Sequence, residues 1–87
     1  MHRYRVTHIQ EGGQRVALKD SAGWFHVARV LTEPPEVGVV LMGALPGLGF
    51  RVVQCAANQT RVRLVFEELR LDLGTAQKLT RGAEAKA

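Results

Sequence analysis

Short runs of apolar or alternating residues, separated by turn residues about every ten positions, constrain this 87-residue chain more than any other feature. The runs cover 3–10, 14–20, 24–31, 37–42, 50–56 and 60–73. Glycines or prolines interrupt the chain between most of them, which is typical of strands joined by short connections. The pattern therefore predicts an all-β, mainly antiparallel protein.

We expect the strands to form a small barrel, because a short sheet must close or be covered to hide its edges. The predicted barrel has five or six strands connected as a meander and resembles the SH3-like or oligonucleotide-binding (OB-like) type. The linker 31–36 is too short for the helix that OB-like barrels usually carry between their third and fourth strands, which favours the SH3-like type or a barrel without that helix. The barrel is predicted over 1–74, and a short helical turn with a flexible C-terminal tail over 75–87.

The last run, 60–73, allows two interpretations. Its apolar residues occupy even positions up to Phe66 and odd positions from Leu69, so one extra residue is needed near Glu67–Glu68. This change predicts a β-bulge or a tight turn there. A second set of apolar residues also fits helical spacing, with Gly74 as a C-cap, and consists of Val62, Val65, Phe66, Leu69, Leu73 and Ala76. β-Branched residues favour a strand over 60–66, whereas 67–73 stays open between strand and helix.

The third run places an aromatic ring on each face of the predicted strand. Phe25 shares its face with Val27 and Leu31, which form a better core set than the neighbours of Trp24. We therefore expect Phe25 inside the barrel, and Trp24 and His26 on or near the surface.

Basic residues share one face of the first, second and last runs, and the opposite face is apolar in each case. If these strands are neighbours, the basic residues form one stripe beside the exposed aromatic side chain. Phosphates of single-stranded nucleic acid bind cations and its bases stack on flat rings. The predicted nucleic-acid-binding residues are Arg3, Arg5, Arg15, Lys19, Trp24, His26, Arg61 and Arg63.

The composition is compatible with this function. The formal net charge is +4, and the positive charge gathers toward both ends of the chain rather than in its middle. We therefore expect a small non-catalytic module that binds single-stranded nucleic acid or another polyanion. The alternative is that Arg and Lys only form the solvated face that every sheet needs.

The run 37–42 suggests a second function, because it is apolar on both of its faces. One face of a barrel strand is buried in the core, so the C-terminal segment or another subunit should cover the other. This predicts a protein-protein interaction or homo-oligomeric module that uses the 37–42 strand as its interface.

The sequence offers little for catalysis or metal binding. The histidines and Cys55 lack the spacing of a structural zinc site, so we expect no metal and no cofactor. Cys55, His26 and Asp20 are the residue types of a thiol nucleophile, but the apolar surroundings of Cys55 predict a buried, inert thiol. We expect no enzyme.

The cellular setting is predicted from two further features. The chain has one cysteine and no apolar run near residue 1, which predicts a cytoplasmic protein. Its longest uncharged run, 37–50, contains Pro46 and is shorter than the roughly 20 residues that a membrane span needs. We therefore expect no membrane partner.

Overall fold

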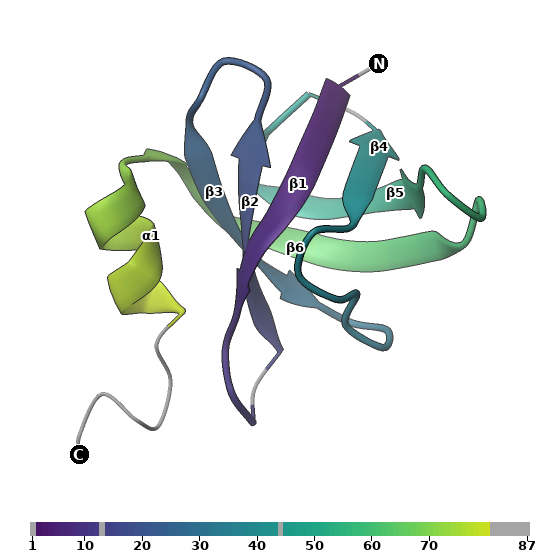
Figure 1. Ribbon diagram of the computed structural model, residues 1–87, viewed down its shortest axis with the longest axis horizontal. Helices are drawn as coiled ribbons and strands as arrows, with labels where there is room; N and C mark the ends of the chain where they lie inside the picture. Colours follow the sequence, from purple (N-terminus) through teal and green to yellow (C-terminus); the bar gives the residue numbers. More distant parts are fainter. Residues whose placement is uncertain (1, 13, 44, 81–87) are drawn as a thin grey trace.

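The computed structural model describes residues 2–12, 14–43 and 45–80, and over these residues it contains six strands followed by one short helix (Figure 1). The strands are β1 (His2–Ile9), β2 (Arg15–Asp20), β3 (Phe25–Val30), β4 (Val40–Gly43), β5 (Gly49–Cys55) and β6 (Arg61–Leu71), and the helix is α1 (Leu73–Leu79). Every predicted run contains a strand. The expected all-β class, with a short C-terminal helix, is confirmed.

The six strands close into an antiparallel barrel in the order β1-β2-β3-β6-β5-β4, and β4 pairs with β1 to complete the ring. The predicted meander is wrong, because β3 pairs with β6 and not with β4. Alternation determines which face a residue occupies but not which strand lies next to it, so the strand order could not be derived from it. The connection from β3 to β4 contains no helix.

Alternating side chains from all six strands fill the barrel. In β1, Tyr4 and Val6 are fully buried, whereas Arg3 and Arg5 between and beside them are exposed. The core cluster consists of Tyr4, Val6, Val16, Leu18, Ala28, Val30, Leu41, Val53, Val62, Leu64 and Phe66. Full burial of each large aliphatic or aromatic side chain contributes about 1.5–3 kcal/mol, so this cluster is the main source of stability.

The predicted bulge near Glu67–Glu68 is confirmed. Phe66 lies opposite Ala28 in β3, and Glu68 lies opposite Val27, so Glu67 is the extra residue in β6. The strand continues beyond this point to Leu71. The strand interpretation of the open segment is therefore correct up to that residue.

A second irregularity follows in β6 before Leu71. Arg70 there has φ 53°, in the left-handed region that non-glycine residues rarely adopt. As a result Leu69 packs against the barrel core, whereas Leu71 packs with Phe25 on the outside of the barrel.

Helix α1 begins directly after β6. Asp72 is its N-cap, and its carboxylate accepts a hydrogen bond of 2.8 Å from the N–H of Thr75. Ala76 is the buried residue of the helix and packs on Ala17 and Phe25. The helix therefore covers part of the outer face of β2 and β3.

This helix explains the burial of β3 on both faces. Phe25 is buried as predicted, but it lies under α1 and not in the barrel. His26, on the other face, is fully buried inside the barrel, so the expectation that it lies at the surface is wrong. Trp24 precedes the strand and is 48% exposed, which confirms the expectation for this side chain.

The run 37–42 is only partly a strand. Val37 is exposed and Gly38 has φ 96°, so these two residues form a turn before β4 begins at Val40. The C-terminal helix packs on β3 and does not cover this run. Val40 and Met42 remain half-buried.

The segment predicted as a helical turn with a flexible tail begins inside α1. The helix ends at Leu79, and Thr80 caps it. The rest of the predicted tail, 81–87, lies outside the described residues.

Candidate functional site

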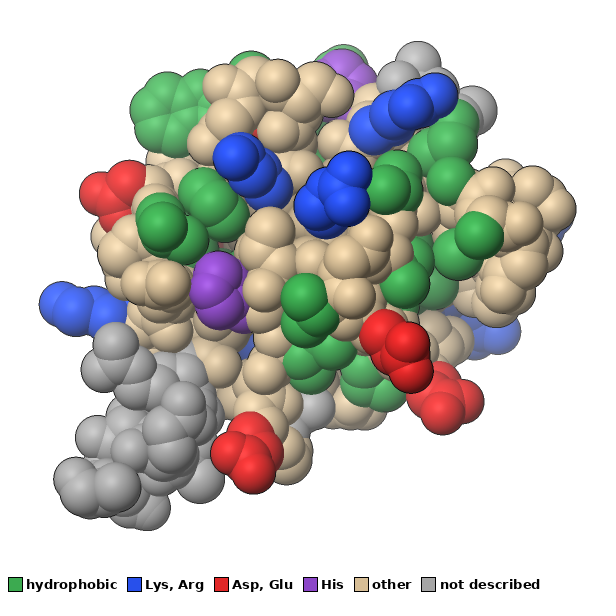
Figure 2. Space-filling model, viewed as in Figure 1, with side chains coloured by type: hydrophobic (Ala, Val, Ile, Leu, Met, Phe, Trp, Pro, Cys, Tyr) green, Lys and Arg blue, Asp and Glu red, His purple; other side chains and the backbone are tan. Residues whose placement is uncertain are grey.

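Arg3, Arg5 and Lys19 lie together on the outer face of the β1–β2 hairpin, and we call these three residues the β1–β2 basic surface. All three side chains are exposed, and Lys19 lies directly opposite Arg5 in the register of the two strands. Figure 2 shows Lys and Arg side chains gathered on the face that β1 crosses in Figure 1. The structure therefore brings together three of the predicted binding residues.

A shallow depression of about 300 Å³ opens at this surface. Its lining consists of Arg3, Tyr4, Arg5, Lys19, Asp20, Ser21 and Val40. This volume is at the lower end of the roughly 300–1,000 Å³ that ligand pockets span. The three cationic side chains and the hydroxyl of Ser21 in its walls suit an anionic group, whereas the carboxylate of Asp20 opposes one.

The charges of the β1–β2 basic surface are not neutralised within the part of the chain that the structure describes, where none of them takes part in an ion pair. Nη1 of Arg5 is 3.5 Å from the carbonyl oxygen of Gly38, and Nζ of Lys19 is 5.8 Å from the centre of the Phe25 ring. Like charges directly opposite each other on neighbouring strands are destabilising. An anion bound between Arg5 and Lys19 would remove that repulsion.

The carboxylate of Asp20 is next to this surface but is occupied by other partners. Its Oδ1 accepts hydrogen bonds from the N–H groups of Ala22 (2.9 Å) and Trp24 (3.0 Å), and its Oδ2 lies 2.7 Å from Nε2 of His26. Burial favours the protonated acid, but the hydrogen bonds outweigh it and hold the pKa of Asp20 below its usual value. Its negative charge therefore stabilises the β2–β3 turn and does not pair with Lys19.

His26 has a structural position inside the barrel. Its Nδ1 accepts a hydrogen bond of 3.2 Å from the N–H of Arg70, which assigns the ring proton to Nε2 and makes His26 the donor to Asp20. The ring packs edge-on against Tyr4 and Phe66, with centroids 6.0 and 6.1 Å away. It therefore connects the β2–β3 turn to the irregular part of β6 and cannot stack on a base.

Tyr4 lies beneath the basic surface and stays neutral. Burial raises its pKa to about 12, the negative charge of Asp20 adds to the increase, and Arg51 opposes it. The buried ring thus adds no negative charge below Arg3 and Arg5.

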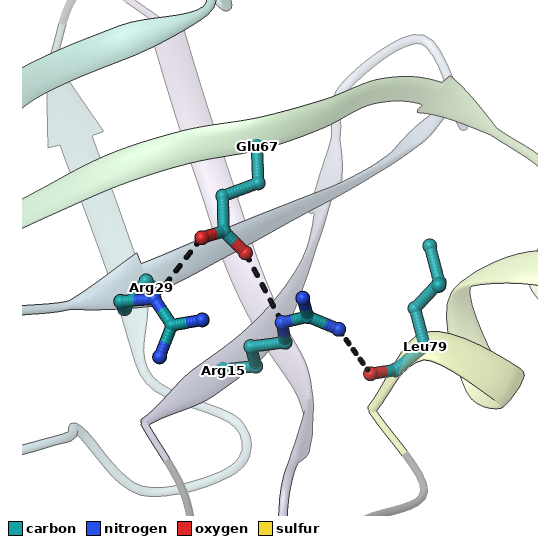
Figure 3. Close-up of polar contacts among 4 residues, drawn as sticks. All are labelled: Arg15, Arg29, Glu67 and Leu79. Carbon is teal, nitrogen blue, oxygen red and sulfur yellow. Dashed lines mark hydrogen bonds and ion pairs between the residues drawn. The ribbon is translucent and has the colours of Figure 1, made fainter.

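Arg15 belongs to a separate network on the other end of β2 (Figure 3). Its Nε is 3.1 Å from Oε1 of Glu67, whose Oε2 is 3.0 Å from Nε of Arg29. Its Nη1 is also 3.5 Å from the carbonyl oxygen of Leu79 at the end of α1. The structure therefore joins Arg15 to β6 and the helix, and does not bring it to the β1–β2 basic surface.

Arg61 and Arg63 are exposed on β6, away from the β1–β2 basic surface. The neighbours of β6 are β3 and β5, so neither β1 nor β2 lies beside it. The condition for one continuous basic stripe, that the first, second and last strands are neighbours, is therefore not met.

Three exposed apolar residues near Arg63 were not predicted from the sequence. Phe50 and Val52 lie on the outside of β5, and Leu31 follows β3. Both faces of the 50–56 run contain apolar and polar residues, so alternation did not show which face is outside. The only available signal was that Phe50 is the aromatic residue of that run.

Over the described ranges, no group of three or more His, Cys, Asp or Glu residues is arranged to hold a metal ion. Cys55 is half-buried, not fully buried as expected. The one helix of this part of the chain is neither long nor apolar enough to cross a membrane.

No protein-family model, curated protein or solved structure matches this chain.

Proposed function

We propose that this chain is a small, non-catalytic binding module. Tyr4 and His26, which could transfer protons, are buried in the barrel, and His26 has a hydrogen-bond partner on each ring nitrogen. The exposed groups around the depression are mainly cations, which bind anions but do not accept protons near neutral pH. This arrangement supports binding and not catalysis.

The ligand that we propose is single-stranded nucleic acid or another polyanion, bound at the β1–β2 basic surface. The observation that carries this proposal is the direct opposition of Arg5 and Lys19 beside Arg3, with no ion pair to a described residue. Successive phosphates supply the missing negative charge. Trp24 is exposed in the β2–β3 turn, which follows Lys19 directly. Its ring is available for stacking on a base at this end of β2.

The test compares two double variants that each remove two positive charges. Arg5→Gln/Lys19→Gln changes the proposed surface, and Arg70→Gln/Lys78→Gln changes two exposed cations elsewhere that form no ion pair with a described residue. Binding of a labelled oligonucleotide is measured by anisotropy over a range of salt concentrations. The slope of log affinity against log salt should fall by about 1.4 in the first variant, or 0.7 for each phosphate that the protein no longer binds.

The second variant should keep the slope of the unmodified protein. Quenching of Trp24 fluorescence by the oligonucleotide gives an independent reading of binding. Absence of binding at low salt, or an equal loss in both variants, would contradict the proposal. An equal loss would mean that only the net charge attracts the ligand.

The alternative function as an interaction or oligomeric module stays a prediction. Val37 is exposed, but Leu41 is fully buried and Val40 and Met42 are half-buried, so the run offers little apolar area to a partner. Sedimentation at micromolar concentration would test this alternative.

A further inference from the structure

A second surface combines exposed apolar side chains with arginines on the outside of β5 and β6, and we call it the β5–β6 face. It consists of Leu31, Phe50, Val52, Arg61 and Arg63. Val52 lies directly opposite Arg63, and the N–H of Leu31 donates to the carbonyl oxygen of Arg63 from the other side. Arg63 thus lies between two aliphatic residues, Val52 on β5 and Leu31 just after β3.

Phe50 is close enough to Arg63 to act with it on one ligand. Phe50 lies opposite Val65 in β6, and Arg63 is two residues from Val65 on the same face of that strand. Diagonal neighbours of this kind are about 7–8 Å apart, within reach of aromatic and long side chains. The face therefore presents a ring and a guanidinium side by side.

The apolar side chains of this face are about half exposed to solvent. Phe50 is 52% exposed and lies near the start of the seven-residue strand β5. Val52 is 46% exposed and lies in the middle of the same strand. Helix α1 covers part of the outer face of the neighbouring strand β3 but packs on Phe25 and Ala17, away from β5. Exposed apolar side chains that lie next to one another are a feature of interaction surfaces.

We infer that the β5–β6 face binds the bases of single-stranded nucleic acid, with Phe50 stacking on a base and Arg61 and Arg63 contacting phosphates. Base stacking on an aromatic ring beside cations is the usual way in which proteins hold unpaired strands without reading their sequence. The inference rests on the proposed function and narrows its ligand from a polyanion to single-stranded nucleic acid.

The charge of the face favours this ligand over a second copy of the chain. Within the described residues, neither Arg61 nor Arg63 forms an ion pair. A two-fold symmetric contact would place the same patch on both subunits and bring these arginines against each other. Charged residues are also depleted from the centres of homodimer interfaces, whereas Arg63 lies at the centre of this face.

The test measures two ligands against variants of Phe50. The first ligand is a labelled oligothymidylate, whose binding is measured directly. The second is inorganic polyphosphate, which carries charge but no bases and is measured by its competition with the oligothymidylate. Phe50→Ala should weaken oligothymidylate binding about 5- to 150-fold, the range found when one stacking interaction is removed. Polyphosphate binding should stay unchanged, because the β1–β2 basic surface is intact.

Three further variants sharpen the result. Phe50→Tyr keeps the ring and should restore oligothymidylate binding. Arg63→Gln should lower the salt slope by about 0.7. Leu73→Ala removes an apolar residue of α1 that is exposed to a similar degree, and should leave both affinities unchanged.

The outcomes separate this inference from the proposed function. If Phe50→Ala binds oligothymidylate as the unmodified protein does, while Arg5→Gln/Lys19→Gln loses binding, the inference fails and the proposed function stands. If the unmodified protein binds neither ligand, both fail. Equal loss of both ligands in Phe50→Ala, or a dimer that this variant dissociates with unchanged oligothymidylate binding, also overturns the inference.

Discussion

The two ends of β2 both oppose one cation to another across neighbouring strands, but only one end neutralises them. At its start, Arg15 lies opposite Arg29, and Glu67 forms an ion pair with both (Figure 3). Together with the contact to Leu79, this carboxylate ties β2, β3, β6 and α1 to one another. The two arginines at this end of β2 are neutralised by Glu67 and stabilise the fold.

At its other end, β2 opposes Lys19 to Arg5, and the nearby carboxylate is used elsewhere. Asp20 accepts hydrogen bonds from His26 and from the turn, and it forms no ion pair with Lys19 or Arg5. Repulsion between the two cations is tolerated there because other interactions stabilise the barrel. By this comparison, an outward basic residue is a candidate for ligand binding when no carboxylate of a described residue pairs with it.

Replacement of Asp20 should have the largest effect on stability. Asp20→Ala leaves the buried N–H of His26 without an acceptor and removes two hydrogen bonds from the turn, so we expect the free energy of unfolding to fall by about 2–4 kcal/mol. Urea unfolding followed by circular dichroism measures the change. Ser21→Ala, in the same turn, is the control and should change stability little. A loss below about 1 kcal/mol would contradict the role given to Asp20.

The loss of the stability contributed by Asp20 at acidic pH should be the next largest effect. Since its pKa in the folded protein is below the ordinary value of about 3.9, the ionised carboxylate favours folding. This contribution is complete above the ordinary pKa and is lost as the pH falls through the lowered folded value. The difference in unfolding free energy between the unmodified protein and Asp20→Asn should therefore shrink below about pH 4. A difference that stays constant in urea unfolding at acidic pH would argue against this.

Removal of the negative charge at the Arg15 end of β2 should have a smaller effect on stability. Glu67→Gln removes two partly exposed ion pairs and leaves Arg15 and Arg29 facing each other, so we expect a loss of about 1 kcal/mol. Glu68→Gln is the matched control, because Glu68 is exposed and forms no ion pair with a described residue. If both variants unfold at the same urea concentration, Glu67 does not stabilise this end of the barrel.

Addition of a negative charge at the Lys19 end of β2 should have the smallest effect on stability. Lys19→Glu places a carboxylate opposite Arg5 and should stabilise the fold by about 0.2–1 kcal/mol. Lys19→Gln removes the repulsion without adding an ion pair and should give a smaller gain. Thermal unfolding of the two variants at low salt measures the difference. A Lys19→Glu protein that is no more stable than Lys19→Gln would show that the two side chains do not interact across the strands.

Alternation predicted much of the fold because burial of one strand face leaves a direct mark on the sequence. The change of parity after Phe66 predicted the bulge at Glu67–Glu68, since one extra residue is the smallest change that returns apolar side chains to the core. Trp24 was also expected to be exposed, but it is exposed because it precedes β3, since the face of β3 that was assigned to solvent carries His26 into the barrel.

The errors concern contacts that depend on turns and on strand pairing, which alternation does not record. His26 looked like a surface residue because its partners, the carboxylate of Asp20 and the N–H of Arg70, depend on the turn and on the pairing of β3 with β6. The burial of Phe25 was predicted, but its covering helix was not. The relation of Arg63 to the first strands depends on strand order, which alternation does not contain.

Closure of the barrel limits how the folded chain can meet other molecules. Since β4 pairs with both β1 and β5, every described strand has a neighbour on each side, and β4 meets β5 through the pairs Leu41–Cys55 and Met42–Gln54. Backbone N–H and C=O groups in these pairings are used within the ring and are not offered to an incoming strand. A peptide cannot enter between the paired strands without breaking their hydrogen bonds. Where the strands are paired on both sides, recognition of a partner therefore depends on the side chains that point away from the barrel.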